Sequence, residues 1–497
     1  MNMATLPRED VLDMVIVGAG ISGIGMAVHM KHDCPDKRVA ILDRRTQIGG
    51  TWDLFRYPGI RSDSDMHTLG FVFEPWKHEK AIADGPSILE YLDGIVAKND
   101  LQSQMRLGQK VISADWDSGT ALWTVVSESA DGSHNRISTR FLFLGAGYYD
   151  YDTPYDAQFP GREKFKGQIV HPQFWPKDLD YSGKKVVVIG SGATAVTIVP
   201  AMATGGAEHV TMLQRTPSWI MSRPAKDAIA NGLRKILPEK VAYTLTRAKN
   251  IFLGDLMFKR SRSQPEKVIE FLEKGLRDNL GPDYDRKAFT PPYNPWEQRL
   301  CFVPDADFFE ALKSGKADVV TDQIEAFDAT GIKLKSGGHI DADVIVTATG
   351  LAMTFAGKIA VAVDGKPVDF GQTYFYRNCM FSNVPNMAGV FGYLNASWTL
   401  RVDIVAQYLT RLFKQMDTYG AVAATPAMPA GAEPEVDDIF DFSSGYIQRG
   451  KHLMPKNAAT LPWRLNQDYR KDRTDMRQAA IDDGVLAFTR AKELVGG

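Results

Sequence analysis

Three features of the 497-residue sequence predict an α/β fold with two Rossmann-like dinucleotide-binding domains and a helical insertion. A short apolar run leads into a glycine-rich turn at residues 14–23, and the same pattern recurs at 186–195. Each turn precedes helical sequence and then a second apolar run, which is the order of a βαβ unit. The third feature is residues 226–280, whose apolar side chains recur with the period of helices.

The first glycine-rich turn, residues 18–23, follows an apolar run typical of a strand buried on both faces. Gly18 permits the tight turn, Gly20 lets a pyrophosphate approach the backbone, and Gly23 lets the helix pack against the strand. The helix N-terminus then offers N–H groups to phosphates. The next apolar run ends at Asp43, whose carboxylate can accept hydrogen bonds from ribose hydroxyls. This site is predicted to hold FAD or NAD.

The second turn, residues 190–195, is a G-x-G-x-x-A, and the strand predicted after its helix ends at Arg215 instead of an acid. Arg215 has the same offset from its turn as Asp43 has from the first turn. A guanidinium suits a 2′-phosphate, which a carboxylate would repel, so the second site is predicted to hold NADPH. The residues expected at this site are Gly190, Gly192, Ala193, Thr194, Arg215 and Thr216.

Two further apolar runs, at 141–144 and 344–346, stop at small residues. We expect them to be the closing strands of the two nucleotide domains, because small residues let backbone segments approach closely. The predicted boundaries are 1–148 and 384–497 for the FAD-binding domain, 149–222 and 317–383 for the NADPH-binding domain, and 223–316 for a helical cap.

The predicted cap is divided by Pro238 and Pro265, each of which can begin a helix but not continue one. Basic residues separate its apolar faces, and a solvated surface is favoured over the alternative of a patch that contacts a membrane. The side chains that mark the apolar faces are Ile251, Phe252, Leu256, Met257, Val268, Phe271, Leu272 and Leu276. Residues 421–435 are rich in Ala and Pro, which predicts an irregular loop.

Composition excludes several classes of protein. The formal net charge of -2 gives no basic excess for nucleic acid. Cys34, Cys301 and Cys379 lie far apart, which argues against a disulfide framework and against a metal cluster. Reduced thiols in a cytoplasmic protein are expected instead. The sequence contains no uncharged apolar run of eighteen residues, so no transmembrane helix is predicted.

One motif is characteristic of a single protein family. Its residues resemble the fingerprint of type I Baeyer–Villiger monooxygenases: Phe165, Gly167, His171, Trp175 and Pro176. Residues 49–65 resemble the same family's other signature. The stretches 294–301, 395–398 and 462–466 are similar to its ethionamide-activating branch, and the resemblance extends from about residue 12 to 470.

The resemblance implies an NADPH- and O2-dependent flavoprotein that inserts one oxygen beside a ketone carbonyl through a C4a-peroxyflavin, with sulfoxidation as a side activity. Arg299 matches the catalytic cation and Asp63 the acid that positions it. Trp463 resembles part of a loop over nicotinamide, and the fingerprint couples domain movement to catalysis. The residues expected around FAD are Gly18, Gly20, Ser22, Gly23, Asp43, Gly50, Thr51, Trp52, Asp63, Val111 and Trp398.

Ser397 is expected to cap a helix whose N–H groups face the flavin. For His171, structural hydrogen bonds are favoured over proton chemistry. The chain departs from the family at Gln298, where many members carry Lys, so preference for NADPH is expected to depend mainly on Arg215 and Thr216, with modest discrimination against NADH.

Three other classes of protein share parts of this sequence pattern. A disulfide reductase needs a redox-active cysteine pair, which the sequence lacks. A non-catalytic redox sensor would not need two complete cofactor sites and a matching active-site arginine. An N- or S-oxygenating flavin monooxygenase shares nearly every motif and stays as the alternative. The expected substrates are a small ketone or organosulfur compound together with O2.

Overall fold

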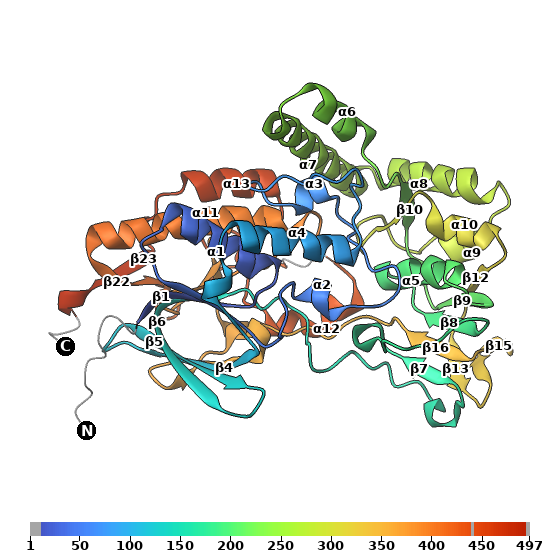
Figure 1. Ribbon diagram of the computed structural model, residues 1–497, viewed down its shortest axis with the longest axis horizontal. Helices are drawn as coiled ribbons and strands as arrows, with labels where there is room; N and C mark the ends of the chain where they lie inside the picture. The colour runs from blue at the N-terminus through green and yellow to red at the C-terminus, as the bar shows by residue number, and fades with distance from the viewer. Residues whose placement is uncertain (1–10, 439–441, 494–497) are drawn as a thin grey trace.

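The computed structural model describes residues 11–438 and 442–493 and is organised around two sheets (Figure 1). The first sheet has eleven strands, and three helices, α1 (Ile21–Asp33), α4 (Gly85–Lys98) and α11 (Trp398–Tyr419), cover one face of it. The second has five strands and lies beside the first. The predicted α/β fold with two dinucleotide-type sheets is therefore confirmed.

The middle of the first sheet is parallel, in the order β3-β2-β1-β6-β21. These strands are β1 (Leu12–Val17), β2 (Val39–Asp43), β3 (Met105–Leu107), β6 (His134–Leu144) and β21 (Met387–Gly389). Antiparallel pairing extends the sheet from β6 through β5 (Leu122–Ser129) to β4 (Gln109–Asp117). Because β1 lies between β2 and β6, the turn after β1 opens at the carboxyl edge, where such sheets bind ligands.

The second sheet is entirely parallel, in the order β12-β9-β8-β16-β7. Its strands are β7 (Gln168–Val170), β8 (Lys185–Ile189), β9 (His209–Gln214), β12 (Ala317–Thr321) and β16 (Val344–Thr347). The turn after β8 leads into α5 (Ala193–Thr204), so it takes the position that the first turn takes before α1. The edge strand β7 comes from the fingerprint segment, which the sequence placed before this domain.

Some strands join a different sheet from the one that the expected boundaries imply. Within 317–383, β17 (Ala360–Val363) pairs with β4, and β18 (Lys366–Pro367) pairs with β17. Next come β19 (Phe375–Tyr376) and β20 (Met380–Phe381), which reach the first sheet through β21. The chain therefore returns to the first sheet near residue 360, before the expected boundary at 384. A hydrophobic pattern identifies strands but not the sheet that they join.

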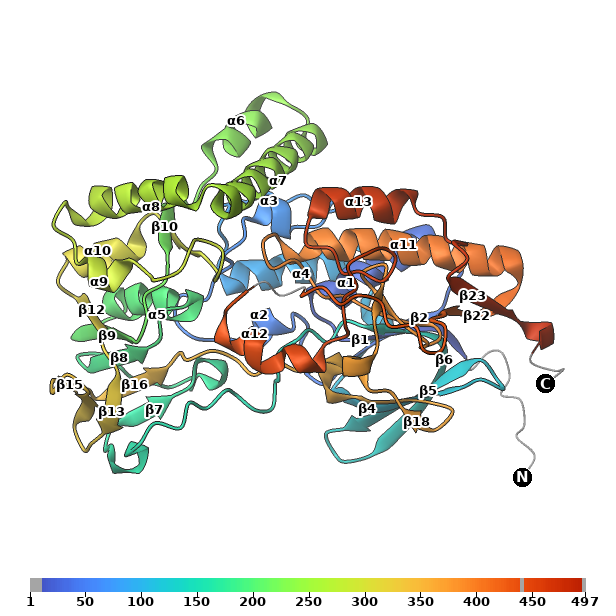
Figure 2. The same cartoon turned by 180° about the vertical axis from the view of Figure 1, so that it is seen from behind.

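The predicted cap contains α6 (Ala228–Ile236), α7 (Glu239–Ser263) and α8 (Pro265–Leu280), and Pro238 and Pro265 stand where α7 and α8 begin, as expected. Figures 1 and 2 both show α6 and α7 rising above the rest of the molecule. The expected apolar faces are only partly buried: Phe252 is 51% and Phe271 58% exposed. Both residues belong to the predicted apolar faces, and they stay exposed because the helices are covered on one side only.

The remaining elements connect or flank the sheets. The helices are α2 (Thr51–Leu54), α3 (Met66–Leu69), α9 (Arg286–Phe289), α10 (Asp307–Lys313), α12 (Gly445–Gly450) and α13 (Tyr469–Gln478). Two small sheets consist of β10 (Ile220–Arg223) with β11 (Cys301–Pro304), and of β13 (Ile324–Phe327), β14 (Gly331–Leu334) and β15 (His339–Asp341).

The predicted loop at 421–435 begins instead with a strand, β22 (Ala421–Pro426), which pairs with β23 (Leu486–Arg490). Alanine-rich sequence has little strand propensity. The prediction failed because pairing with a distant segment, invisible to a local pattern, holds this strand. In the described part of the chain, no helix is long and apolar enough to cross a membrane.

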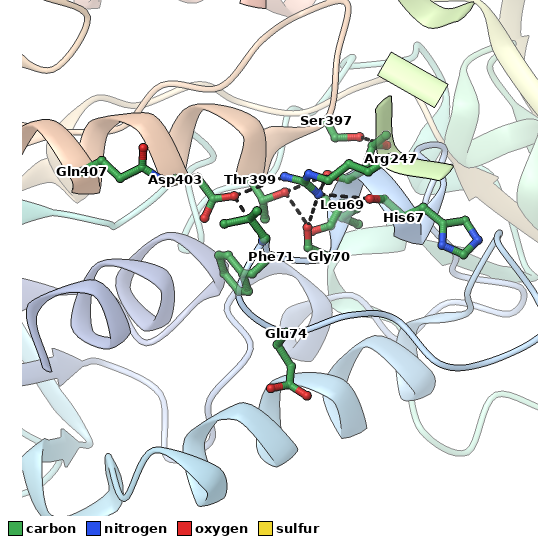
Figure 3. Close-up of polar contacts among 12 residues, drawn as sticks. His67, Leu69, Gly70, Phe71, Glu74, Arg247, Ser397, Thr399, Asp403 and Gln407 are labelled. Atoms are coloured by element: carbon green, nitrogen blue, oxygen red, sulfur yellow. Dashed lines mark hydrogen bonds and ion pairs between the residues drawn. The ribbon is translucent and has the colours of Figure 1, made fainter. Parts of the chain in front are cut away.

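Arg247 of α7 connects the cap to the part of the chain that surrounds the first sheet (Figure 3). Its guanidinium donates hydrogen bonds to the carbonyls of His67, Thr68 and Gly70, at 3.0, 3.1 and 2.6 Å. It also forms a buried ion pair, 3.2 Å long, with Asp403 of α11. Because residues 67–70 lie just after Asp63 in the chain, this contact holds the segment that enters the site described next.

Candidate functional site

A cavity of about 340 Å³ lies at the carboxyl edge of the first sheet and extends to the start of α5. Most of the residues predicted to bind cofactor line it: Gly18, Gly20, Ser22, Asp43, Gly50, Thr51, Trp52, Asp63, Val111, Ala193, Thr194 and Trp398. Arg299 lines it as well. The predicted residues that do not line it are Gly23, Gly190, Gly192, Arg215, Thr216 and Trp463.

The first glycine of each turn has a conformation that other residues rarely adopt. Gly18 has φ 105°, and a Cβ there would stand 2.5 Å from the carbonyl oxygen of Gly145. Gly190 has φ 136°, and a Cβ there would stand 2.3 Å from the carbonyl oxygen of Ala348. In both units, therefore, the small residues after the closing strand make room for the turn. Gly23 serves packing, since its Cβ would overlap the carbonyl of Gly18.

Both helix N-termini are open to a phosphate. Gly20 and Gly192 stand at the N-caps of α1 and α5, and neither helix has a side-chain capping bond. Asp43 is buried, and its carboxylate accepts hydrogen bonds from the backbone N–H groups of Ala19 and Arg45, at 2.7 and 2.8 Å. Burial raises its pKa, and these two bonds oppose the rise. Uncapped N–H groups beside a fixed acidic acceptor suit a dinucleotide.

Arg215 follows β9 and is exposed. It forms no hydrogen bond or ion pair with any described residue. The neighbouring Thr216 is half-buried, and its carbonyl accepts a hydrogen bond of 2.7 Å from the hydroxyl of Ser191 in the second turn. That bond ties the strand end to the turn. The arrangement leaves a free cation beside a Rossmann-type turn, which is suitable for a phosphate ligand.

A second cavity, of about 140 Å³, adjoins the first. Four residues line both cavities: Asp63, Ser64, Ala396 and Arg299. Apolar side chains from the cap and from the loop before α11, including Met257, Leu300 and Leu394, cover much of the second cavity. The shared wall thus places a cation between the dinucleotide cavity and a smaller second chamber.

Arg299 forms no hydrogen bond and no ion pair within 4.0 Å in the described chain, so it does not contact Asp63 directly. The two charges still act on one another. Burial raises the pKa of Asp63, and Arg299 opposes that rise. Burial alone would lower the pKa of Arg299, but Tyr446, Tyr148 and Asp63 outweigh it and raise that pKa. Arg299 is therefore a permanent cation whose accessible surface faces the two cavities.

Two other arginines, Arg56 and Arg61, flank the segment 57–60 beside the first cavity. Arg61 is paired with Asp307 at 2.5 Å, and Arg56 is paired with Asp53. Each is thus paired with a carboxylate, which Arg56 shares with Arg45, whereas Arg299 has no such partner in the described chain. The guanidinium of Arg299 consequently stays available to a ligand.

A tyrosine cluster beside Arg299 was not anticipated from sequence. The hydroxyls of Tyr148 and Tyr149 lie 2.6 Å apart, and burial raises the pKa of both tyrosines and that of Tyr446. Tyr148 also stacks on Trp398, with ring centroids 5.2 Å apart. The available signal was the run of aromatic residues directly after the closing strand of the first sheet.

Ser397 is the residue before α11, as predicted, but its side chain does not cap the helix. Its hydroxyl instead lies 2.6 Å from that of Thr68, so the expectation of a capping bond was wrong. Trp398 is anchored because its indole N–H donates to the hydroxyl of Ser22 at 2.8 Å. Trp463 packs against Tyr376 and does not reach either cavity.

The fingerprint residues lie at the edge of the second sheet. Phe165 is buried against Phe327, and a Cβ at Gly167 would stand 2.3 Å from the carbonyl of Asp343. The Nδ1 atom of His171 accepts a hydrogen bond from a backbone N–H, while its buried Nε2 has no partner in the described chain. Trp175 packs half-buried on the core of the second unit, and Pro176 is exposed.

Two dinucleotide folds that meet at one cavity define a two-domain nucleotide-dependent oxidoreductase. A family model described as pyridine nucleotide-disulphide oxidoreductase matches residues 15–248. The three cysteines are free thiols, so the likeness lies in the nucleotide fold.

Comparison with known proteins is more specific. The chain is 48% identical over 490 residues to the probable FAD-binding monooxygenase AlmA of Acinetobacter baylyi, covering 98% of each chain. It is 48% identical over 486 residues to FAD-containing monooxygenase EthA of Mycobacterium tuberculosis, covering 98% of this chain and 99% of the relative. It therefore belongs to this family of FAD-containing monooxygenases. Cyclohexanone monooxygenase from Rhodococcus sp. Phi1 bound to NADP+ has the same fold, with a TM-score of 0.77, 20% identity and coverage of 97% and 99%.

Proposed function

We propose that the protein is a Baeyer–Villiger monooxygenase. The reaction consumes a ketone, O2, NADPH and a proton, and it yields an ester or lactone, NADP+ and water. One oxygen atom enters the bond between the carbonyl carbon and its neighbour, and the other is reduced to water. The same site is expected to oxidise organosulfur compounds as a side activity.

The proposed cofactor positions follow from the two turns. FAD would occupy the first cavity, with its pyrophosphate at the N-terminus of α1 and its ribose near Asp43. NADPH would bind at the second turn, with its 2′-phosphate near Arg215. FAD, when bound, accepts hydride from NADPH and supplies the reduced flavin that activates O2.

The position of Arg299 carries the proposal. It is an unpaired cation on the wall shared by the dinucleotide cavity and the second cavity. Attack on a ketone carbonyl places negative charge on oxygen, and a fixed guanidinium stabilises that charge without risk of deprotonation. Asp63 would orient Arg299 through its field, because the two side chains do not touch. Loss of such a cation typically costs about 3–4 kcal/mol of transition-state stabilisation.

Replacing Arg299 tests this role. Arg299→Ala should abolish ester formation and leave anaerobic reduction of the flavin by NADPH within about twofold, because hydride transfer places little charge on oxygen. Arg299→Lys should restore only part of the activity, since a flexible point charge does not reproduce a planar guanidinium. The measurements are stopped-flow reduction without O2 and mass spectrometry of the products with O2.

The matched control is Arg56→Ala, which removes an equal charge from a residue that lines neither cavity. It should keep most of the ester formation. Ester formation at the wild-type rate by Arg299→Ala would refute the role of Arg299. Products from amines or thioethers, with none from any ketone, would instead favour the N- or S-oxygenating alternative.

A further inference from the structure

The α6–α7 hairpin carries an exposed apolar face. In α7, Val241, Leu245 and Phe252 are 46%, 49% and 51% exposed, and their spacing of four and seven residues places them on one side of the helix. In α6, Ile229 and Ile236 are 58% and 77% exposed. We call these five residues the hairpin face. Isolated exposed apolar residues are ordinary, but five on two helices that contact one another indicate an interaction surface.

The charges of the hairpin favour an anionic partner. Residues 227–263 contain eight Lys and Arg but three Asp and Glu, in a chain whose net charge is -2. Each of the three acids is already paired: Asp227 with Lys249, Glu239 with Lys77, and Asp255 with Lys259.

Three cations remain without partners. Lys235 and Lys240 are exposed next to residues of the hairpin face, and Arg260 is exposed near the end of α7. None of the three forms an ion pair with another described residue. Exposed apolar side chains bordered by unpaired Lys and Arg are the pattern of helices that lie in the interface of an anionic membrane.

The opposite side of α7 reaches the chamber beside Arg299. Ile251, Gly254 and Met257 line that second cavity, while Phe252, next to Ile251, faces outward. One helix therefore separates the hairpin face from the chamber. Figures 1 and 2 show that α6 and α7 rise from the body, so a flat surface can meet them without obstruction from the two sheets.

We propose that the hairpin face docks on the surface of an anionic lipid bilayer. The apolar side chains enter the interface between headgroups and acyl chains, and Lys235, Lys240 and Arg260 lie against the lipid phosphates. Binding is peripheral, since neither helix is apolar enough to cross a membrane. This places the chamber next to a phase in which apolar molecules concentrate.

Vesicle sedimentation of the flavin-loaded protein tests the proposal. With vesicles of phosphatidylcholine and phosphatidylglycerol, the wild type should bind at least about tenfold more tightly than with phosphatidylcholine alone, and added salt should weaken binding. Leu245→Asp/Phe252→Asp should lower the affinity at least about tenfold, because charge on the apolar face opposes insertion. Lys235→Glu/Lys240→Glu should cause a similar loss on anionic vesicles only.

The matched control is Val436→Asp/Leu453→Asp, which adds the same charges at apolar residues that are 59% and 38% exposed outside the hairpin. This variant should bind like the wild type. Flavin content and thermal unfolding of each variant establish that it is folded.

Three results would overturn the proposal. The first is a wild type that does not bind vesicles, and the second is equal binding by the wild type and the hairpin variant. The third is self-association of the wild type without vesicle binding, abolished by the hairpin variant, which would assign the face to a second copy of the chain. The readout does not require turnover, so it is independent of the proposed reaction.

Discussion

Arg215 and Arg299 are both arginines without an ion-pair partner, but their surroundings differ. Arg215 is exposed at the end of β9, whereas Arg299 is exposed on the wall that two cavities share. Arg215→Ala should raise the Kd for NADPH roughly ten- to hundredfold, because a lost charge-assisted hydrogen bond is worth about 1.5–3 kcal/mol. The Kd for NADH, which lacks the phosphate, should change less than about twofold. Titration of the flavin-loaded protein with each coenzyme measures both constants.

The charge-retaining variant Arg215→Lys serves as the control and should keep part of the preference for NADPH. If Arg215→Ala weakens both coenzymes equally, the residue supports the fold of the site and does not recognise the phosphate.

His67 predicts a dependence of stability on pH. It is buried, both ring nitrogens lack hydrogen-bond partners in the described chain, and burial lowers its pKa from the ordinary value of 6.5. Below pH 6.5, the His67 ring therefore binds a proton in the unfolded chain but not in the folded chain. Stability is complete above that pH and falls, as pH decreases toward the lowered pKa, by up to about 1.4 kcal/mol per pH unit.

Chemical denaturation from pH 7.5 to 5 measures this dependence. His67→Met removes the titrating ring while keeping a similar volume, so its stability should fall less steeply with acid than that of the wild type. Identical slopes in the two proteins would show that His67 does not contribute. His171, whose pKa is also lowered by burial, should account for part of the remaining slope.

At the scale of elements, α7 is attached to the first unit through Arg247. Removing Arg247 would leave buried Asp403 with only His29 and the backbone N–H of Val72 as partners, and three backbone carbonyls would lose a donor. Arg247→Ala should therefore lower the free energy of unfolding by about 3–5 kcal/mol. Thermal and chemical unfolding measure the loss. Lys240→Ala, an exposed change on the same helix, should stay within about 0.5 kcal/mol of the wild type. An equal loss of stability in both variants would contradict the structural role given to Arg247.

Elements with strong local signals could be predicted from sequence. The strands before both glycine-rich turns, and the starts of α7 and α8 at Pro238 and Pro265, depend on nearby residues. The pairing of β22 with β23 and the return of β17 to the first sheet could not be predicted, because distant partners decide them. The exposure of Phe252 was missed for a related reason: a helical period shows an apolar face but not whether another element covers it.

At the scale of the whole molecule, the two nucleotide folds and the cap contribute residues to the two cavities that share Arg299. The glycines and Asp43 belong to a recognisable local pattern, whereas Asp63 and Arg299 were indicated only by the resemblance to a monooxygenase family. The chamber was not predictable, because Met257, Leu300 and Leu394 come from separate segments. The tyrosine hydroxyls beside Arg299 were missed because no spacing rule describes them.

The central claim is that this assembly inserts one atom of O2 into a ketone. Turnover of a ketone with NADPH under oxygen-18 gas, followed by mass spectrometry of the product, tests it most directly. The proposed function predicts an ester or lactone that carries a single oxygen-18 atom, formed in step with NADPH consumption. Hydrogen peroxide as the only oxidised product across linear, cyclic and aryl ketones, or an ester without the label, would contradict it.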